Sequence, residues 1–136
     1  MPTGRTAFKA IAVLVIHLGE AKFCTSMCAA LKRRDFEVLC GNMSDVSRKY
    51  VKTIVPDAVI IRVDQRTTHL LRSALMNMSE KNGLSSDLPK FVWATCRLPT
   101  PLRQLATAAG IQVLKNNAGY AGLARAIIAA IDRAPW

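Results

Sequence analysis

The chain has 136 residues, 51% of them hydrophobic, and its 19 lysine and arginine residues against nine acidic residues give a formal net charge of +10. This length suits one domain whose core needs no disulfide or metal ion to hold it together. The longest apolar run, residues 10–16, is far shorter than the roughly 18 residues that cross a membrane, so we expect no membrane segment.

The first half of the chain alternates between strand and helix patterns. A continuous apolar run with many β-branched residues predicts a strand that is buried on both faces, and apolar side chains at helical spacing from Phe23 onward predict the helix that follows it. Pro56 and Asp57 end the second helix before the third strand. We expect strands at 9–16, 36–40 and 58–63 and helices at 20–35 and 46–54, the second helix capped by Ser44 or Asp45.

The second half continues the alternation. Thr67 or Thr68 suits the cap of the third helix and Gly83 its end, and two prolines open the fourth helix, which Gly110 ends. We expect helices at 67–82, 102–109 and 120–134 and strands at 91–96 and 111–115.

Five strands, each followed by a helix after a short link, predict an α/β fold with a single doubly wound, five-stranded parallel sheet, the (βα)5 or flavodoxin-like arrangement. No linker or repeat divides the chain, so we expect one domain over 1–136 with its core at about 9–132. In such sheets ligands bind at the carboxyl ends of the strands, which makes the residues at those ends the candidates for a site.

Cofactor motifs are missing at the first strand end. The sequence HLGE at 17–20 has one glycine, which excludes a dinucleotide fingerprint, and the chain has neither a phosphate-binding P-loop nor a flavin or cobalamin pattern. The four cysteines, Cys24, Cys28, Cys40 and Cys96, and the two distant histidines lack the spacing of a zinc site. We therefore expect no cofactor and no metal, and thiols that stay reduced in the cytoplasm.

Three stretches carry a resemblance to a known family. The sequences PDAVIIRV at 56–63, PKFVWATC at 89–96 and AAGIQVLK at 108–115, in this order, resemble the receiver domain of bacterial response regulators. The resemblance implies that Thr95 is the family's hydroxyl that follows the phosphoryl group and that Lys115 is the lysine that pairs with it.

The same resemblance places other residues where the family keeps its phosphorylation machinery. The family's acidic pair falls on His17 and Leu18, and its phospho-acceptor aspartate falls on Arg62. A guanidinium cannot be the nucleophile, and an imidazole with a leucine is a poor oxygen cage for Mg²⁺. Asp64 is disfavoured as a substitute acceptor because no acidic pair surrounds it, and Glu20 supplies only one carboxylate.

Two further positions depart from the family. Asn116 follows the lysine where receivers have proline, and Gln112 stands where they have an aromatic switch residue. The chain therefore resembles a degenerate receiver, or pseudo-receiver, in which we expect no catalytic residue.

Arg62 and Lys115, with His17 beside them, would make a cationic pocket. Two cations in a partly buried site repel each other unless an acid or a bound anion neutralises them. Three arrangements stay open: Asp64, Glu20 or another acid pairs with Arg62, the pocket binds an anion through Arg62 and Lys115, or Arg62 extends to solvent.

These features predict a non-catalytic, phosphorylation-independent signalling domain that acts by protein–protein contacts, for example in a transcriptional regulator. The resemblance implies a homodimer or partner face at 102–132. The alternative from another class is a basic regulator that binds an anion or nucleic acid through the Arg62 and Lys115 pocket or the positive surface. A metal-dependent phosphotransfer enzyme is disfavoured because the carboxylates are missing.

Overall fold

The structure, a computed structural model, describes residues 10–19, 21–42, 56–79, 88–115 and 119–133. The strands in this part of the chain form one sheet in the order β2-β1-β3-β4-β5, and every neighbouring pair is parallel. Their bounds are Ala12–His17 for β1, Glu37–Gly41 for β2, Ala58–Val63 for β3, Lys90–Ala94 for β4 and Gln112–Lys115 for β5. The predicted doubly wound parallel sheet is confirmed.

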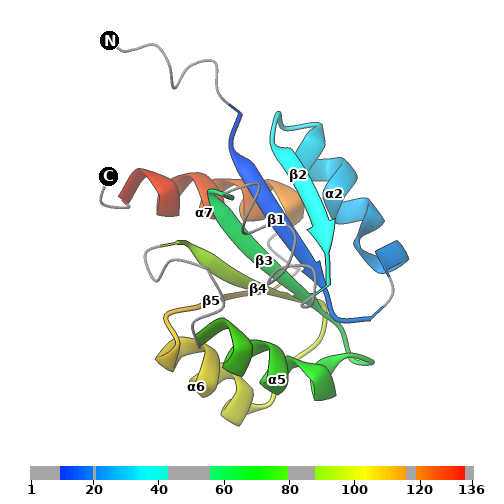
Figure 1. The fold of residues 1–136 in the computed structure, drawn as a ribbon, viewed down its shortest axis with the longest axis vertical. Coiled ribbons are helices and arrows are strands. Elements are labelled where there is room, and N and C mark those ends of the chain that lie inside the picture. Colours follow the sequence, from blue (N-terminus) through cyan, green and yellow to red (C-terminus); the bar gives the residue numbers. More distant parts are fainter. Residues whose placement is uncertain (1–9, 20, 43–55, 80–87, 116–118, 134–136) are drawn as a thin grey trace.

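Helices cover both faces of the sheet (Figure 1). A short 3-10 helix, Ala21–Cys24, leads into α2, Thr25–Lys32, and the other described helices are α5, Thr68–Ser79, α6, Thr100–Ala108, and α7, Gly119–Arg133. One apolar core joins the sheet to α2 and α7, and a second joins it to α5 and α6. No helix in the described ranges is both long and apolar enough to cross a membrane.

The central strands show why the sequence folds this way. Val13 and Val15 of β1 belong to the core under α2 and α7, whereas Leu14 and Ile16 belong to the core under α5 and α6, and all four are 0% exposed. A strand buried on both faces needs apolar residues at every position, and this explains the continuous apolar run. The same alternation in β3 assigns Arg62 to the face of α2 and α7.

Element boundaries differ from the prediction mainly at α2. The helix expected over 20–35 begins as a 3-10 turn and ends at Lys32. Asp35 adopts a left-handed conformation with φ of 68°, and the N–H of Phe36 donates to Leu31 O at 3.2 Å, which closes the helix before the next strand. At the predicted end of α6, Gly110 has φ of +77° and the N–H of Ile111 donates to Ala106 O at 2.8 Å, as glycine permits.

The remaining strands and helices begin and end within a few residues of the predicted bounds. For β3 both bounds match the prediction. The first strand begins later than expected, at Ala12, and runs on to His17. The helix expected at 46–54, its caps Ser44 and Asp45, and Gly83 lie outside the described residues.

Candidate functional site

The sheet brings the strand ends that the sequence singled out to one edge. In the strand register His17 of β1 lies beside Arg62 of β3, and Arg62 lies beside Trp93 of β4. Ala94, the last residue of β4, lies beside Lys115 of β5. The backbone positions that match the receiver phosphorylation site therefore share the carboxyl edge of the sheet.

Arg62 forms an ion pair at this edge with a residue two positions further along the chain. Its Nη1 donates to Oδ2 of Asp64 at 3.0 Å, and the two side chains are 18% and 17% exposed. Both side chains leave the strand on the same side, as the period of two requires. Of the three arrangements left open by the sequence, the structure shows the acidic partner, and that partner is Asp64.

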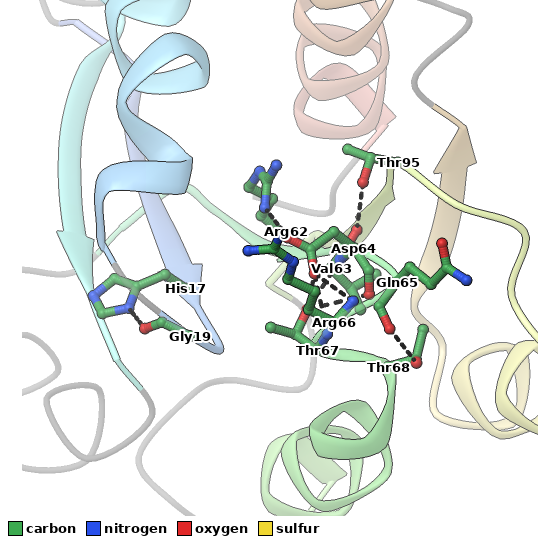
Figure 2. A network of polar contacts seen from close by, with 10 residues as sticks. All are labelled: His17, Gly19, Arg62, Val63, Asp64, Gln65, Arg66, Thr67, Thr68 and Thr95. Atoms are coloured by element: carbon green, nitrogen blue, oxygen red, sulfur yellow. Dashed lines mark hydrogen bonds and ion pairs between the residues drawn. The ribbon is translucent and has the colours of Figure 1, made fainter.

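The other oxygen of Asp64 organises the start of α5 (Figure 2). Asp64 Oδ1 accepts hydrogen bonds from the N–H groups of Arg66 at 2.9 Å and Thr67 at 3.0 Å and from the Thr67 hydroxyl at 3.1 Å. The N–H of Asp64 donates in turn to Thr67 Oγ1 at 2.9 Å. Thr67 stands directly before α5, the first of the two positions predicted for the cap, and its hydroxyl bonds to Asp64. The Thr68 hydroxyl donates to Gln65 O.

These contacts determine the ionisation of Asp64. Partial burial alone would raise the pKa of the carboxyl, but hydrogen bonds from Arg62, from the Thr67 side chain and from the Arg66 N–H outweigh it, and the charge of Arg62 adds to them. The pKa of Asp64 is therefore held below its usual value. The carboxylate is therefore ionised at neutral pH, and both of its oxygens already accept hydrogen bonds.

The two positions that match the family's acidic pair lie beside the ion pair without joining it. His17 Nδ1 and Gly19 O lie 2.8 Å apart, within hydrogen-bond distance, and Figure 2 draws this contact separately from the network around Asp64. Leu18 packs against the apolar core under α5 and α6. Glu20 lies outside the described residues.

The loop after β1 also approaches the Asp64 turn closely. A Cβ added to Gly19 would come within 3.1 Å of Thr67 Cγ2. Gly19 therefore packs where most side chains would press on Thr67, the residue that shares hydrogen bonds with Asp64.

Lys115 and Thr95 line a cavity of about 410 Å³ beyond the ends of β4 and β5. Thr95 Oγ1 donates to Val63 O at 3.4 Å, a contact that holds its side chain against β3. The cavity is lined by Ala94, Thr95, Cys96, Arg97, Leu98, Arg103, Val113 and Lys115. Arg62 is not among these residues, so the structure places Arg62 and Lys115 in separate parts of the edge.

Sequence reasoning missed Arg97 and Arg103 as members of this cavity. Arg97 directly follows the two strand-end residues that the prediction includes, and Arg103 lies in the first turn of α6. The signal was an arginine immediately after the fourth strand and another near the start of the next helix. Both belonged to the scattered basic residues, and only the sheet order places them beside Lys115.

Within the described part of the chain, the edge offers anion contacts but no acidic cage, because no group of three histidine, cysteine, aspartate or glutamate residues is placed there to hold a metal ion. Among the described residues that line the cavity, three are cations and none is a carboxylate. The chemistry within its reach is the binding of a negatively charged group.

Comparisons with known proteins identify the fold. No protein-family model and no curated protein matches the sequence. A response regulator CheY-like protein from Mesorhizobium loti is similar in structure with a TM-score of 0.67 and 12% identity, covering 90% of this chain and 99% of that one. A response regulator receiver protein from Sinorhizobium medicae gives a TM-score of 0.59 and 15% identity, covering 92% and 97%.

A putative pilus assembly-related protein from Burkholderia pseudomallei is a third neighbour, with a TM-score of 0.59, 12% identity and coverage of 95% of this chain and 96% of that one. Identities this low show the fold alone. The chain therefore has the flavodoxin-like fold of response regulator receivers, while the loss of the phosphorylation chemistry stays a prediction.

Replacing Asp64 by asparagine should lower the free energy of unfolding at neutral pH by about 1–3 kcal/mol, because the charge-assisted hydrogen bonds weaken. Since the folded pKa is depressed, the contribution of the ionised carboxylate is complete above the unfolded pKa of about 3.9 and is lost as the pH falls through the lower folded pKa. Urea unfolding of both proteins should show their stabilities converging in that acidic range. A difference that stays the same once the Asp64 carboxyl is protonated in the folded protein would contradict an electrostatic role.

Proposed function

We propose that this domain is a phosphorylation-independent, receiver-like regulatory module that acts through protein contacts and has no catalytic activity of its own. The observation that carries the proposal is the Arg62–Asp64 ion pair at the end of β3. Phosphorylation at the end of β3 would need a carboxylate nucleophile beside Mg²⁺, and an internal salt bridge stands at that position instead.

The state of Asp64 supports this proposal further. An alternative acceptor would need a carboxylate oxygen that is open to attack a phosphoryl donor. Oδ2 of Asp64 is bonded to Arg62, and Oδ1 accepts three hydrogen bonds from the turn that begins α5. Phosphorylation there would exchange these contacts for a larger anion and would disrupt the start of the helix.

Incubation with acetyl phosphate and Mg²⁺ should leave the intact mass of the protein unchanged, and beryllofluoride with Mg²⁺ should leave its amide NMR shifts unchanged. The physical reason is the missing carboxylate cage. A phosphoryl adduct on Asp64, or tight Mg²⁺ binding, would contradict the proposal.

The matched control restores the acids by His17→Asp, Leu18→Asp and Arg62→Asp in one variant, with folding checked by circular dichroism. Because Thr95 and Lys115 remain in place, we expect this variant to gain Mg²⁺-dependent shifts that the wild type lacks. The single variant Arg62→Asp should not gain them, since the acidic pair is still missing.

The proposed contact face is the surface of α6, β5 and α7, within residues 102–132. In the sheet formed by the described strands β5 lies at an edge, where a partner could pair with it. On α7, Ile128 is a large apolar side chain with 43% of its surface exposed, and Ala121 and Ala129 are exposed small residues that allow a second helix to approach. We propose that a second copy of this chain binds this face.

Replacing Ile128 by arginine should shift the protein from dimer to monomer in sedimentation velocity, because the charge would be buried without a partner. Met76→Arg is the matched control, since Met76 lies on α5 outside the face and is 45% exposed. We expect it to leave the dimer intact. A wild-type protein that sediments as a monomer at every concentration would contradict the homodimer.

We propose a second function, anion binding, on the strength of the cavity beside β4 and β5. Arg97, Arg103 and Lys115 bring three positive charges to its lining, and its 410 Å³ falls in the usual range of small-molecule sites. A phosphate-bearing small molecule fits this chemistry. In this form the proposed site uses Lys115 with the two arginines, and Arg62 stays with Asp64.

Pyrophosphate should bind in calorimetric titrations, and Arg103→Ala should weaken that binding by about tenfold, the equivalent of 1.4 kcal/mol. Arg72→Ala removes an exposed cation on α5 and should have no effect. Equal loss in both variants would point to the general positive surface. Steeply salt-dependent binding of duplex DNA that survives Arg103→Ala would favour nucleic acid as the partner instead.

The remaining features of the proposed role follow from the type of domain. We propose that it works in the cytoplasm, as the regulatory part of a transcriptional regulator.

A further inference from the structure

The cavity beyond β4 and β5 has an apolar floor. Ala94 and Leu98, which are 2% and 4% exposed, belong to the core under α5 and α6. Val113 and Cys96, both partly exposed, pack against that core. All four residues line the cavity. Its floor is therefore the carboxyl end of the core under α5 and α6.

The positive charges of the cavity lie at its rim. Arg97, Arg103 and Lys115 are exposed, and they come from the loop after β4, the first turn of α6 and the end of β5. Arg103 Nη2 donates to Thr100 Oγ1 at 3.1 Å, which fixes the guanidinium at the start of α6, and a guanidinium carries further N–H donors. An anionic group finds its contacts at this rim.

The inner side of the cavity disfavours an anion. Burial, and then the negative charge of Asp64, raise the pKa of the Cys96 thiol above its usual value, so the field of Asp64 reaches the floor. Thr95, which also lines the cavity, donates its hydroxyl proton to Val63 O at 3.4 Å and not to a ligand. A ligand therefore binds with its charge outward, at the rim, and the rest of the molecule inward.

The size and the lining of the cavity point to an organic ligand. Its volume of about 410 Å³ suits a small organic molecule, and an inorganic phosphate at the rim would leave the apolar floor uncovered. An apolar body on the floor would remove the surfaces of Leu98 and Val113 from water, which favours binding. A nucleobase is less suitable, because its polar edge would lie against these two side chains without hydrogen-bond partners.

We propose that the anion which binds this cavity is a phosphate ester with an apolar body about the size of an aromatic ring. The phosphoryl group contacts Arg97, Arg103 and Lys115, and the body lies on Leu98 and Val113. This inference rests on the anion binding proposed above and narrows the ligand to one chemical class. Val113 is then a specificity-determining residue, because it contacts the body of the ligand and not its charge.

Calorimetric titrations of the full chain with phenyl phosphate and with inorganic phosphate compare one charged group with and without an apolar body. Phenyl phosphate should bind at least about tenfold more tightly, because its ring leaves water on binding. Equal affinities would overturn the apolar body, and pyrophosphate binding would show that the anion site itself still stands. If phenyl phosphate, inorganic phosphate and pyrophosphate all fail to bind, the anion site is wrong and this inference fails with it. Adenosine monophosphate that binds more tightly than phenyl phosphate would overturn the apolar body in favour of a nucleotide.

The substitution Val113→Thr replaces one methyl group of the floor by a hydroxyl of nearly the same size. It should weaken phenyl phosphate binding about fivefold and leave pyrophosphate binding unchanged, whereas Arg103→Ala should weaken both. Val38→Thr is the matched control, since Val38 is also half-buried and lies on β2 at the opposite edge of the sheet, and it should change neither affinity.

A Val113→Thr protein that binds phenyl phosphate as tightly as the wild type would overturn the placement of the body on the floor. Circular dichroism checks the fold of each variant. The comparison of the ligands uses the wild type alone, so it decides the ligand class even if a variant does not fold.

Discussion

The ion pair between Arg62 and Asp64 joins the end of the central strand, β3, to the turn that leads into α5. Asp64 bonds the guanidinium with one oxygen and the N–H groups of Arg66 and Thr67 with the other. Both side chains are mostly buried, so neither could lose its partner without leaving a charge in a poorly hydrated place. The end of β3, the loop after β1 and the start of α5 are all arranged around this contact.

Much of the fold follows from local pattern. Apart from His17 and Arg62 near their carboxyl ends, β1 and β3 are apolar at every position, because helices cover both faces of the sheet. Gly110 ends α6 as expected because only a left-handed residue fits there. The early end of α2 was not predictable in the same way, since Asp35 adopts a left-handed φ that its residue type only weakly favours.

The candidate site was predictable in part. The spacing to the Pro-Asp turn placed Arg62 at the end of its strand, and strand alternation placed Asp64 on the same side. The cavity could be predicted only with the sheet order known. Arg97 and Arg103 are distant from Lys115 in sequence, and the pairing of β4 with β5 brings them together.

The close approach of Gly19 to Thr67 has a consequence for how relatives of this protein would be recognised. A side chain at position 19 would press on the threonine that shares hydrogen bonds with Asp64, and the ion pair of Arg62 depends on Asp64. These contacts therefore tie the four positions to one another as a set. A search pattern built on Gly19, Arg62, Asp64 and Thr67 would find sequences with this ion pair. A pattern built on the acidic pair and the phospho-acceptor aspartate of receivers would miss them.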